Sequence, residues 1–168
     1  MKNRKIIISG PPGSGKTTII NALKAKDYNC LEEINPAKIN DPTIKNNKNS
    51  LSEFLFKHRE KQYNQFTGQL AFYDRSMIDV VAYLSYWNIQ YPKHWSQIIQ
   101  NCQYANNVFY TPSWKEIYKN STNRLETYKE AQLIEIFLKK TYLDFGYNII
   151  EIPKVGLEER LNFIINKI

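Results

Sequence analysis

One glycine-rich stretch near the amino terminus constrains this chain more than any other feature. It consists of Gly10, Pro11, Pro12, Gly13, Ser14, Gly15, Lys16 and Thr17, followed by Thr18. The stretch matches G-x-x-x-x-G-K-[ST] at every fixed position. An apolar run at 5–9 predicts a buried strand before it, and residues 17–26 show the apolar periodicity of a helix after it. A tight loop that joins a strand to a helix is therefore expected.

The spacing of this loop gives it a definite chemistry. Its three glycines allow backbone N–H groups to approach an anion, and the helix that follows adds the positive end of its dipole. Lys16 supplies a mobile charge for the outer phosphates of a nucleotide, while the Thr17 hydroxyl is placed to ligate Mg²⁺. The alternative is a chance glycine-rich turn, and the flanking strand and helix argue against it. The stretch is thus predicted to be a P-loop that binds ATP with Mg²⁺.

Length and composition favour one folded domain over residues 1–168. The 168-residue chain is 42% hydrophobic and 14% aromatic, which is enough for a sizeable core. Its net charge of +7 suits a polyanionic substrate, although a lysine- and asparagine-rich coding bias explains that charge equally well. No basic run alternates with aromatic residues, so nucleic acid is not expected as a partner.

The sequence also carries predictions about compartment and redox state. The chain enters its first strand directly, without a signal-peptide pattern, and it contains no apolar run of membrane-spanning length. Cys30 and Cys102 lack metal-type spacing and have apolar neighbours, which is typical of reduced thiols in a core. A cytoplasmic protein is expected.

Strand-like and helical segments alternate along the chain. Predicted strands lie at 5–9, 27–31, 69–73, 107–110 and 147–152. Predicted helices lie at 17–26, 51–66, 77–87, 95–101, 126–144 and 157–168. This alternation predicts an α/β, three-layer P-loop NTPase fold with a five-stranded parallel sheet. Ser50 and Ser76 are expected to cap the helices that follow them, and Gly146 is expected to end the long helix.

Acidic residues follow two of the predicted strands. Right-handed crossovers bring the carboxyl ends of parallel strands to one edge of the sheet, where ligands bind. Glu33 is a candidate base for an acceptor hydroxyl, with Glu32 or Asp74 as alternatives, although two glutamates in a solvated loop are a simpler interpretation. Asp74 is predicted to hold or orient the metal and its water. Arg75 is placed to reach an acceptor hydroxyl or phosphate.

Two further segments are candidates for substrate contacts. Residues 34–68 combine an Asn-, Pro- and Lys-rich loop with a helix and are predicted to contact the phosphoryl acceptor. Residues 113–126 form a polar stretch that could close as a lid and bring Arg124 to the charge that develops during transfer. An ordinary solvated loop is the alternative for this stretch. The turn at 153–156 is expected to border the nucleotide base.

Several groups of residues together suggest a family. They are Gly10 to Thr18, Cys30-Leu31-Glu32-Glu33, Asp74-Arg75-Ser76 with Asp79 and Ala82-Tyr83, and Gly146-Tyr147, Ile152-Pro153 and Glu158-Glu159-Arg160. On these residues the chain resembles compact P-loop proteins described as AAA-domain or predicted ATPases, related to the ribosylnicotinamide kinase domain of bacterial NAD-biosynthesis proteins. The resemblance covers nearly the whole chain. At 168 residues the chain is too short for a ring-forming AAA motor with its helical lid domain.

A wider resemblance is to deoxyribonucleoside kinases, which also carry a glutamate after the second strand and an acid-Arg-Ser motif after the third. It implies that Glu33 is the base and that Asp74 and Arg75 contact the metal and the acceptor. The chain departs from the family pattern at Asn35-Pro36-Ala37-Lys38, where an arginine is frequent. Acceptor recognition is therefore expected to differ.

Two classes of function follow from these observations. The leading hypothesis is an ATP- and Mg²⁺-dependent phosphotransferase that moves the γ-phosphoryl group to a small-molecule hydroxyl, with a nucleoside or nucleotide as the expected acceptor. Its candidate catalytic residues are Lys16, Glu33, Asp74, Arg75 and Arg124. The alternative is an ATP-binding switch or slow NTPase that acts through a protein partner. GTP specificity is disfavoured because no N/T-K-x-D segment follows a strand.

Overall fold

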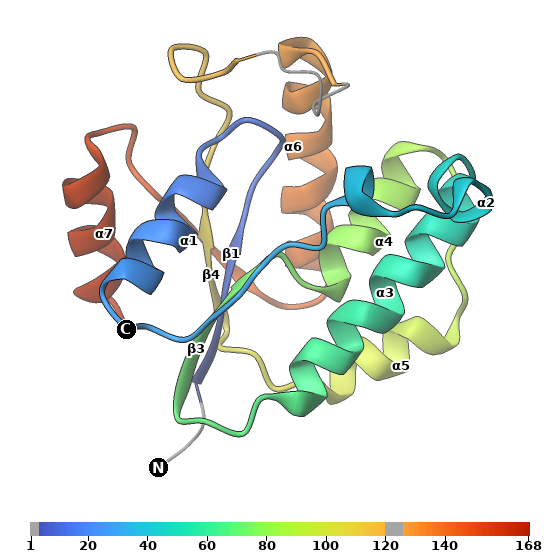
Figure 1. Ribbon diagram of the computed structural model, residues 1–168, viewed down its shortest axis with the longest axis horizontal. Helices are drawn as coiled ribbons and strands as arrows, with labels where there is room; N and C mark the ends of the chain where they lie inside the picture. Colours follow the sequence, from blue (N-terminus) through green and yellow to red (C-terminus); the bar gives the residue numbers. More distant parts are fainter. Residues whose placement is uncertain (1–3, 120–125) are drawn as a thin grey trace.

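Five parallel strands form the sheet at the centre of the molecule (Figure 1). The computed structural model describes residues 4–119 and 126–168. The strands are β1 (Arg4–Ser9), β2 (Cys30–Leu31), β3 (Leu70–Asp74), β4 (Asn107–Tyr110) and β5 (Asn148–Glu151). Their order in the sheet is β2-β3-β1-β4-β5, and every pairing is parallel, which confirms the prediction. Because β1 lies between β3 and β4, the ends of both neighbours flank the loop that follows β1.

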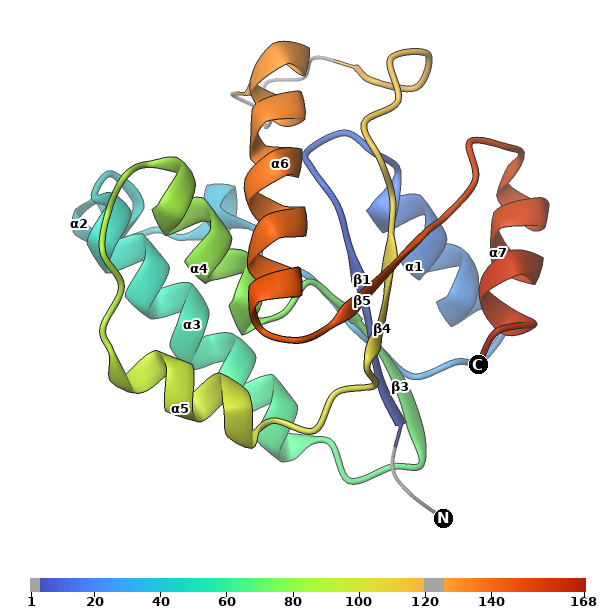
Figure 2. The same ribbon diagram turned by 180° about the vertical axis from the view of Figure 1, so that it is seen from behind.

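Helices cover both faces of this sheet. They are α1 (Lys16–Ala25), α2 (Pro42–Lys45), α3 (Lys48–Gln65), α4 (Met77–Tyr86), α5 (His94–Asn101), α6 (Tyr128–Asp144) and α7 (Leu157–Ile165). Figures 1 and 2 show α1 and α7 on one face of the sheet and α3, α4, α5 and α6 on the other. The molecule therefore has the three layers that the sequence predicts. None of the helices in the described ranges has the length and apolarity that a bilayer crossing requires.

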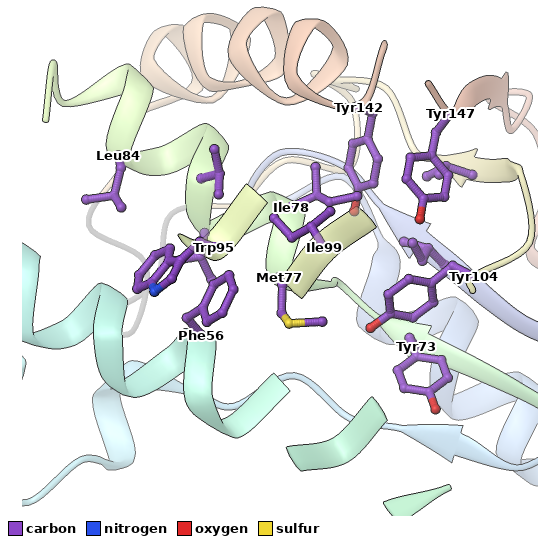
Figure 3. Close-up of a cluster of buried hydrophobic side chains, with 14 of the residues drawn as sticks. Phe56, Tyr73, Met77, Ile78, Leu84, Trp95, Ile99, Tyr104, Tyr142 and Tyr147 are labelled. Carbon is purple, nitrogen blue, oxygen red and sulfur yellow. The ribbon is translucent and has the colours of Figure 1, made fainter. Parts of the chain in front are cut away.

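The core is divided by β1, whose alternate residues point to opposite faces of the sheet. Ile6 and Ile8 pack beneath α1 and α7, whereas Ile7 belongs to the cluster on the side of α3, α4 and α5. Figure 3 shows this second cluster, in which the rings of Phe56 and Trp95 stack with centroids 3.9 Å apart. Packing on both faces thus fixes the strand from which the P-loop begins.

Helix capping agrees with the prediction at two sites and differs at one. Ser76 and Asp79 form the expected capping box of α4, and Gly146 has φ +84° directly after α6. The prediction that Ser50 caps the helix at 51–66 is wrong. That helix, α3, begins after Asn47, whose side chain accepts a hydrogen bond from Ser50 N–H at 3.0 Å. Asparagine satisfies a free N–H of the first turn as well as serine does, so the helix starts earlier.

The chain after α1 departs most from the prediction. β2 spans two residues rather than 27–31, because only Cys30 and Leu31 pair with β3 at this edge of the sheet. Residues 34–49, predicted as a loop, contain the 3-10 helix η1 (Pro36–Lys38) and α2. The side chain of Asp41 caps α2, and a proline at the first helical position costs no backbone hydrogen bond.

Candidate active site

Glycines make the turns of the P-loop between β1 and α1. Gly13 and Gly15 have φ values of +75° and +89°, which favour a residue without a Cβ atom. Gly10 has φ +151°, and a Cβ added to it would lie 2.3 Å from the backbone oxygen of Thr111 at the end of β4. Both backbone conformation and lack of space therefore require glycine in this loop.

Lys16 lies against the loop that precedes it. Its Nζ donates to the carbonyl oxygen of Pro11 at 2.8 Å, and only 5% of the residue is exposed. Burial and the nearby Arg75 lower the pKa of Lys16 to about 8, although Glu33 and Asp74 oppose this shift. Because an ammonium group has three donors, one carbonyl partner leaves capacity for phosphate oxygens.

A cluster of charged side chains lies at the carboxyl ends of β2 and β3. Arg75 Nε donates to Glu33 Oε1 at 2.6 Å, and Arg75 Nη1 donates to Asp79 Oδ1 at 3.2 Å. Arg59 Nη2 lies 4.0 Å from the same Glu33 oxygen. Arg75 adopts φ +72°, an uncommon value for a residue with a side chain. The edge predicted from strand order thus carries a network of paired charges.

The two glutamates after β2 have different surroundings. Glu32 is exposed and pairs with Lys24 on α1, away from the cluster. Burial alone would raise the pKa of Glu33, but Arg75, Lys16 and Arg59 outweigh it and hold that pKa below its usual value. Glu33 is therefore ionised at neutral pH and is the glutamate of this pair that belongs to the cluster.

Asp74 ends β3 with a buried and incompletely satisfied carboxylate. Only 4% of the residue is exposed, and its Oδ1 has no hydrogen-bond partner within the described ranges. Burial and the neighbouring Glu33 raise the pKa of Asp74 to about 6. No group of three or more His, Cys, Asp or Glu side chains within those ranges could hold a metal alone. One free carboxylate oxygen and the exposed Thr17 hydroxyl instead fit Mg²⁺, which usually takes few protein ligands and completes its shell with phosphates and water.

Asp79 has a larger part in the cluster than the sequence indicates, since its spacing predicts only a helix cap. Its Oδ1 accepts a hydrogen bond from Ser9 Oγ at 2.6 Å. Its Oδ2 accepts from Ser76 N–H at 2.8 Å and from the Tyr142 hydroxyl. Asp79 thereby connects β1, α4 and α6 and holds Arg75 in place. Ser9 and Tyr142 lie far along the chain from Asp79, so no local pattern could reveal these contacts.

Comparison with known protein families identifies the family of this chain. A family model described as an AAA domain matches residues 5–160. The chain belongs to this AAA-domain family. The family resemblance carried by the P-loop and the Asp74-Arg75-Ser76 motif is thereby confirmed. A comparison with curated proteins finds no match.

Solved structures share the fold of this AAA-domain protein at low sequence identity. Deoxyadenosine kinase from M. mycoides with bound dATP superposes with a TM-score of 0.77 at 14% identity, and the match covers 98% of each chain. Thymidylate kinase from Candida albicans gives 0.66 at 12% identity over 99% of this chain and 91% of that one. NadR protein in complex with NR gives 0.67 at 14% identity over 98% of this chain and 49% of the NadR chain. The predicted fold class, that of P-loop nucleoside and nucleotide kinases, is confirmed.

The predicted lid of the AAA-domain protein is described only in part. Arg124 falls within 120–125, outside the described residues, so its role stays a prediction. At the start of the segment, Ser113 N–H donates to Glu135 Oε2 on α6 at 2.9 Å. The start of the predicted lid, at Ser113, is therefore anchored to α6.

A pocket of ≈ 470 Å³ lies between α4 and the start of α6. Its lining consists of Lys48, Tyr83, Tyr86, Trp87, Glu126, Glu130 and Ile134. Tyr83 connects this pocket to the charged cluster, because its ring centroid lies 5.6 Å from Arg75 Cζ. The sequence could not reveal this pocket, because apolar periodicity does not distinguish a buried face from a pocket wall.

Proposed function

We propose that this protein is an ATP- and Mg²⁺-dependent phosphotransferase that moves the γ-phosphoryl group to the hydroxyl of a nucleoside or nucleotide. One observation carries the proposal, which is that donor-side and acceptor-side groups lie together. Lys16 of the P-loop and the buried carboxylate of Asp74 lie beside the Glu33–Arg75 pair. This pair adjoins an aromatic pocket through Tyr83. Deoxyadenosine kinase and thymidylate kinase, which share the fold, support the choice of acceptor class.

On the donor side, the loop from Gly10 to Thr18 would bind the triphosphate, and Lys16 would contact its outer oxygens. Thr17 and Asp74 would hold Mg²⁺, which neutralises phosphate charge when bound. Arg124, brought in by the lid segment, would stabilise the charge that develops on the transferred group. Most of the rate acceleration would come from positioning and charge stabilisation, as is general for phosphoryl transfer.

On the acceptor side, the pocket of ≈ 470 Å³ beside α4 would receive the planar base. This volume is within the range of small-ligand sites, and aromatic walls suit a planar ring. Glu33 would accept the proton of the attacking hydroxyl, a contribution of about 10²–10⁴-fold. Arg75 would orient the acceptor next to Tyr83. The predicted acceptor region at 34–68 contributes Lys48 to this pocket, and the other lining residues come from α4 and the segment 126–134.

An acceptor screen tests the proposal. The protein is incubated with Mg-ATP and a panel of nucleosides, nucleotides and ribosylated vitamins, and both ATP consumption and phosphorylated product are measured. At least one acceptor should raise ATP consumption about tenfold or more above the rate with water alone, since a base in place contributes at least this much. Lys16→Ala and Asp74→Asn should abolish the increase.

If the protein binds ATP but no acceptor raises its consumption, the phosphotransferase proposal fails. The ATP-binding switch or slow NTPase is then the better assignment. The control for Asp74→Asn is its affinity for ATP in the absence of Mg²⁺. If the carboxylate acts through the metal, this affinity should stay within about threefold of the wild-type value. A loss of ATP affinity without metal would show that the substitution disturbs the P-loop instead.

A further inference from the structure

Arg160 on α7 is a buried cation with unsatisfied donors among the described residues. It is 7% exposed, and its Nε and Nη1 lack acceptors within the described part of the chain. Burial lowers the pKa of this guanidinium, and no nearby carboxylate offsets the shift. Residues 1–3 and 120–125 contain no acidic side chain. An unpaired buried charge is costly, so Arg160 suits a partner that the described residues do not supply.

The acidic residues next to Arg160 are engaged elsewhere. Glu158 pairs with Lys26 at the end of α1, with 3.4 Å between the charged atoms. Glu159 Oε2 accepts a hydrogen bond from Gly156 N–H at 3.2 Å and so caps the helix. Two carboxylates therefore lie within two positions of the arginine in the sequence, and neither neutralises it.

The guanidinium of Arg160 lies over the P-loop. Its Nη1 would be 2.9 Å from a Cβ atom added to Gly15, the N-cap residue of α1. Ile117 Cδ1 would lie 3.1 Å from the same added Cβ atom. Figure 2 shows α7 beside α1 on the same face of the sheet. A substantial side chain at position 15 would displace Arg160. Position 15 therefore favours glycine for a second reason besides its positive φ.

Trp114 lies next to this guanidinium, with Arg160 Cζ 5.5 Å from its ring centroid. A guanidinium next to an aromatic ring still presents N–H donors along its edge. The N–H groups of a guanidinium form strong hydrogen bonds with anionic oxygens, for which phosphate and carboxylate are the best partners. At the N-terminus of a P-loop helix, phosphate is the anion to expect.

We propose that Arg160, which lies next to Trp114, binds a phosphate oxygen of the donor nucleotide beside Gly15. This inference rests on the proposed function, because it requires the P-loop to hold a nucleotide. It adds a cation to the donor site from α7, outside the P-loop, the lid segment and the Asp74 motif. Arg160 acts here as a binding residue, and the contact also ties α7 to the occupied site.

Binding measurements on Arg160→Gln test this role. Calorimetry compares Mg-ATP with inorganic triphosphate, which has the phosphates but no base or ribose. Both affinities should fall together by about 10- to 100-fold, as expected for lost hydrogen bonds to a charged partner. Arg160→Lys should recover part of the loss, because lysine keeps the charge but not the fork of donors. Lys167→Gln, which removes a cation just beyond the end of α7, should change both affinities by less than about threefold.

A second readout separates ligand binding from structural support. In Arg160→Ala, millimolar guanidinium ion should restore part of the affinity for triphosphate, because the space left by the side chain can admit the free cation. Unchanged affinities in Arg160→Gln would overturn the inference while leaving the proposed function intact. It would equally be overturned if Mg-ATP weakened and triphosphate did not, since the contact would then be to the base or ribose. A wild-type chain that binds neither ligand would overturn the proposed function, and this inference with it.

Discussion

Gly10 is the residue at which the P-loop leaves least freedom for substitution. Its φ of +151° and its contact with Thr111 act together, since an added Cβ would lie 2.2 Å from Thr111 Oγ1 and 2.3 Å from the backbone oxygen. Gly10→Ala should therefore lower the free energy of unfolding by more than about 2 kcal/mol, the upper range for left-handed strain alone. Urea denaturation at neutral pH measures the change.

Gly146→Ala is the matched control for this substitution. Gly146 also has positive φ, at +84°, but no atom lies within 4 Å of an added Cβ. The variant should lose about 1–2 kcal/mol, from backbone strain without a clash. If Gly10→Ala were no more destabilised than Gly146→Ala, the close approach of the P-loop to β4 would not be a constraint on the fold.

At the scale of secondary-structure elements, Asp79 is the point where three of them meet. It caps α4, accepts from Ser9 at the end of β1 and from Tyr142 on α6, and pairs with Arg75. These contacts are made by the ionised carboxylate. Removal of the charge would leave the Arg75 guanidinium with Glu33 as its remaining carboxylate partner.

Asp79→Asn should therefore destabilise the protein by about 3 kcal/mol or more at pH 7, as for other broken buried pairs. Burial alone would raise the pKa of Asp79, but Arg75 and Arg59 outweigh it, so the folded pKa is lower than the unfolded value. The carboxylate thus contributes its full stabilisation above about pH 4, the unfolded pKa, and loses it as pH falls through the folded pKa. The difference between wild type and variant should shrink from pH 6 to pH 3 in denaturation experiments.

An exposed ion pair on α6 provides the control for Asp79→Asn. Asp144 on α6 pairs with Lys140 one turn away, and both side chains are exposed. Asp144→Asn should change stability little at either pH, because exposed helix pairs contribute about 0.3–0.5 kcal/mol. A gap between wild type and Asp79→Asn that stayed constant down to pH 3 would mean that the charge of Asp79 is not what stabilises the junction.

The elements that could be predicted from sequence are those with strong local signals. Apolar runs located β1, β3 and β4, and the P-loop motif fixed the start of α1, because each depends on neighbours within a few positions. β2 was predicted too long and the short α2 was missed, since tertiary pairing decides the one and a local cap the other. The cluster around Asp79 and the position of Arg160 over Gly15 join segments far apart in sequence, so only the fold could reveal them.

At the scale of the whole molecule, the proposed donor site would join elements from both ends of the chain. The P-loop lies at its start, Asp74 and Thr111 near its middle, and Arg160 close to its end. A ligand that bridges these segments binds the folded chain and not the unfolded one. Occupation of the site should therefore stabilise the molecule as a unit, and the size of the effect follows from mass action.

Mg-ATP at about 100 times its Kd should add about 2.7 kcal/mol to the free energy of unfolding. For a chain of this length that corresponds to a rise in Tm of about 5–10 °C, which a thermal-shift assay measures. Lys16→Ala, which removes the ammonium that now contacts Pro11, should show a much smaller rise at the same nucleotide concentration. An equal rise in both proteins would place the nucleotide away from the P-loop lysine. A rise in Tm with adenosine as large as that with Mg-ATP would show that the phosphates contribute nothing to binding. That result would contradict a site whose positive charges bind phosphate.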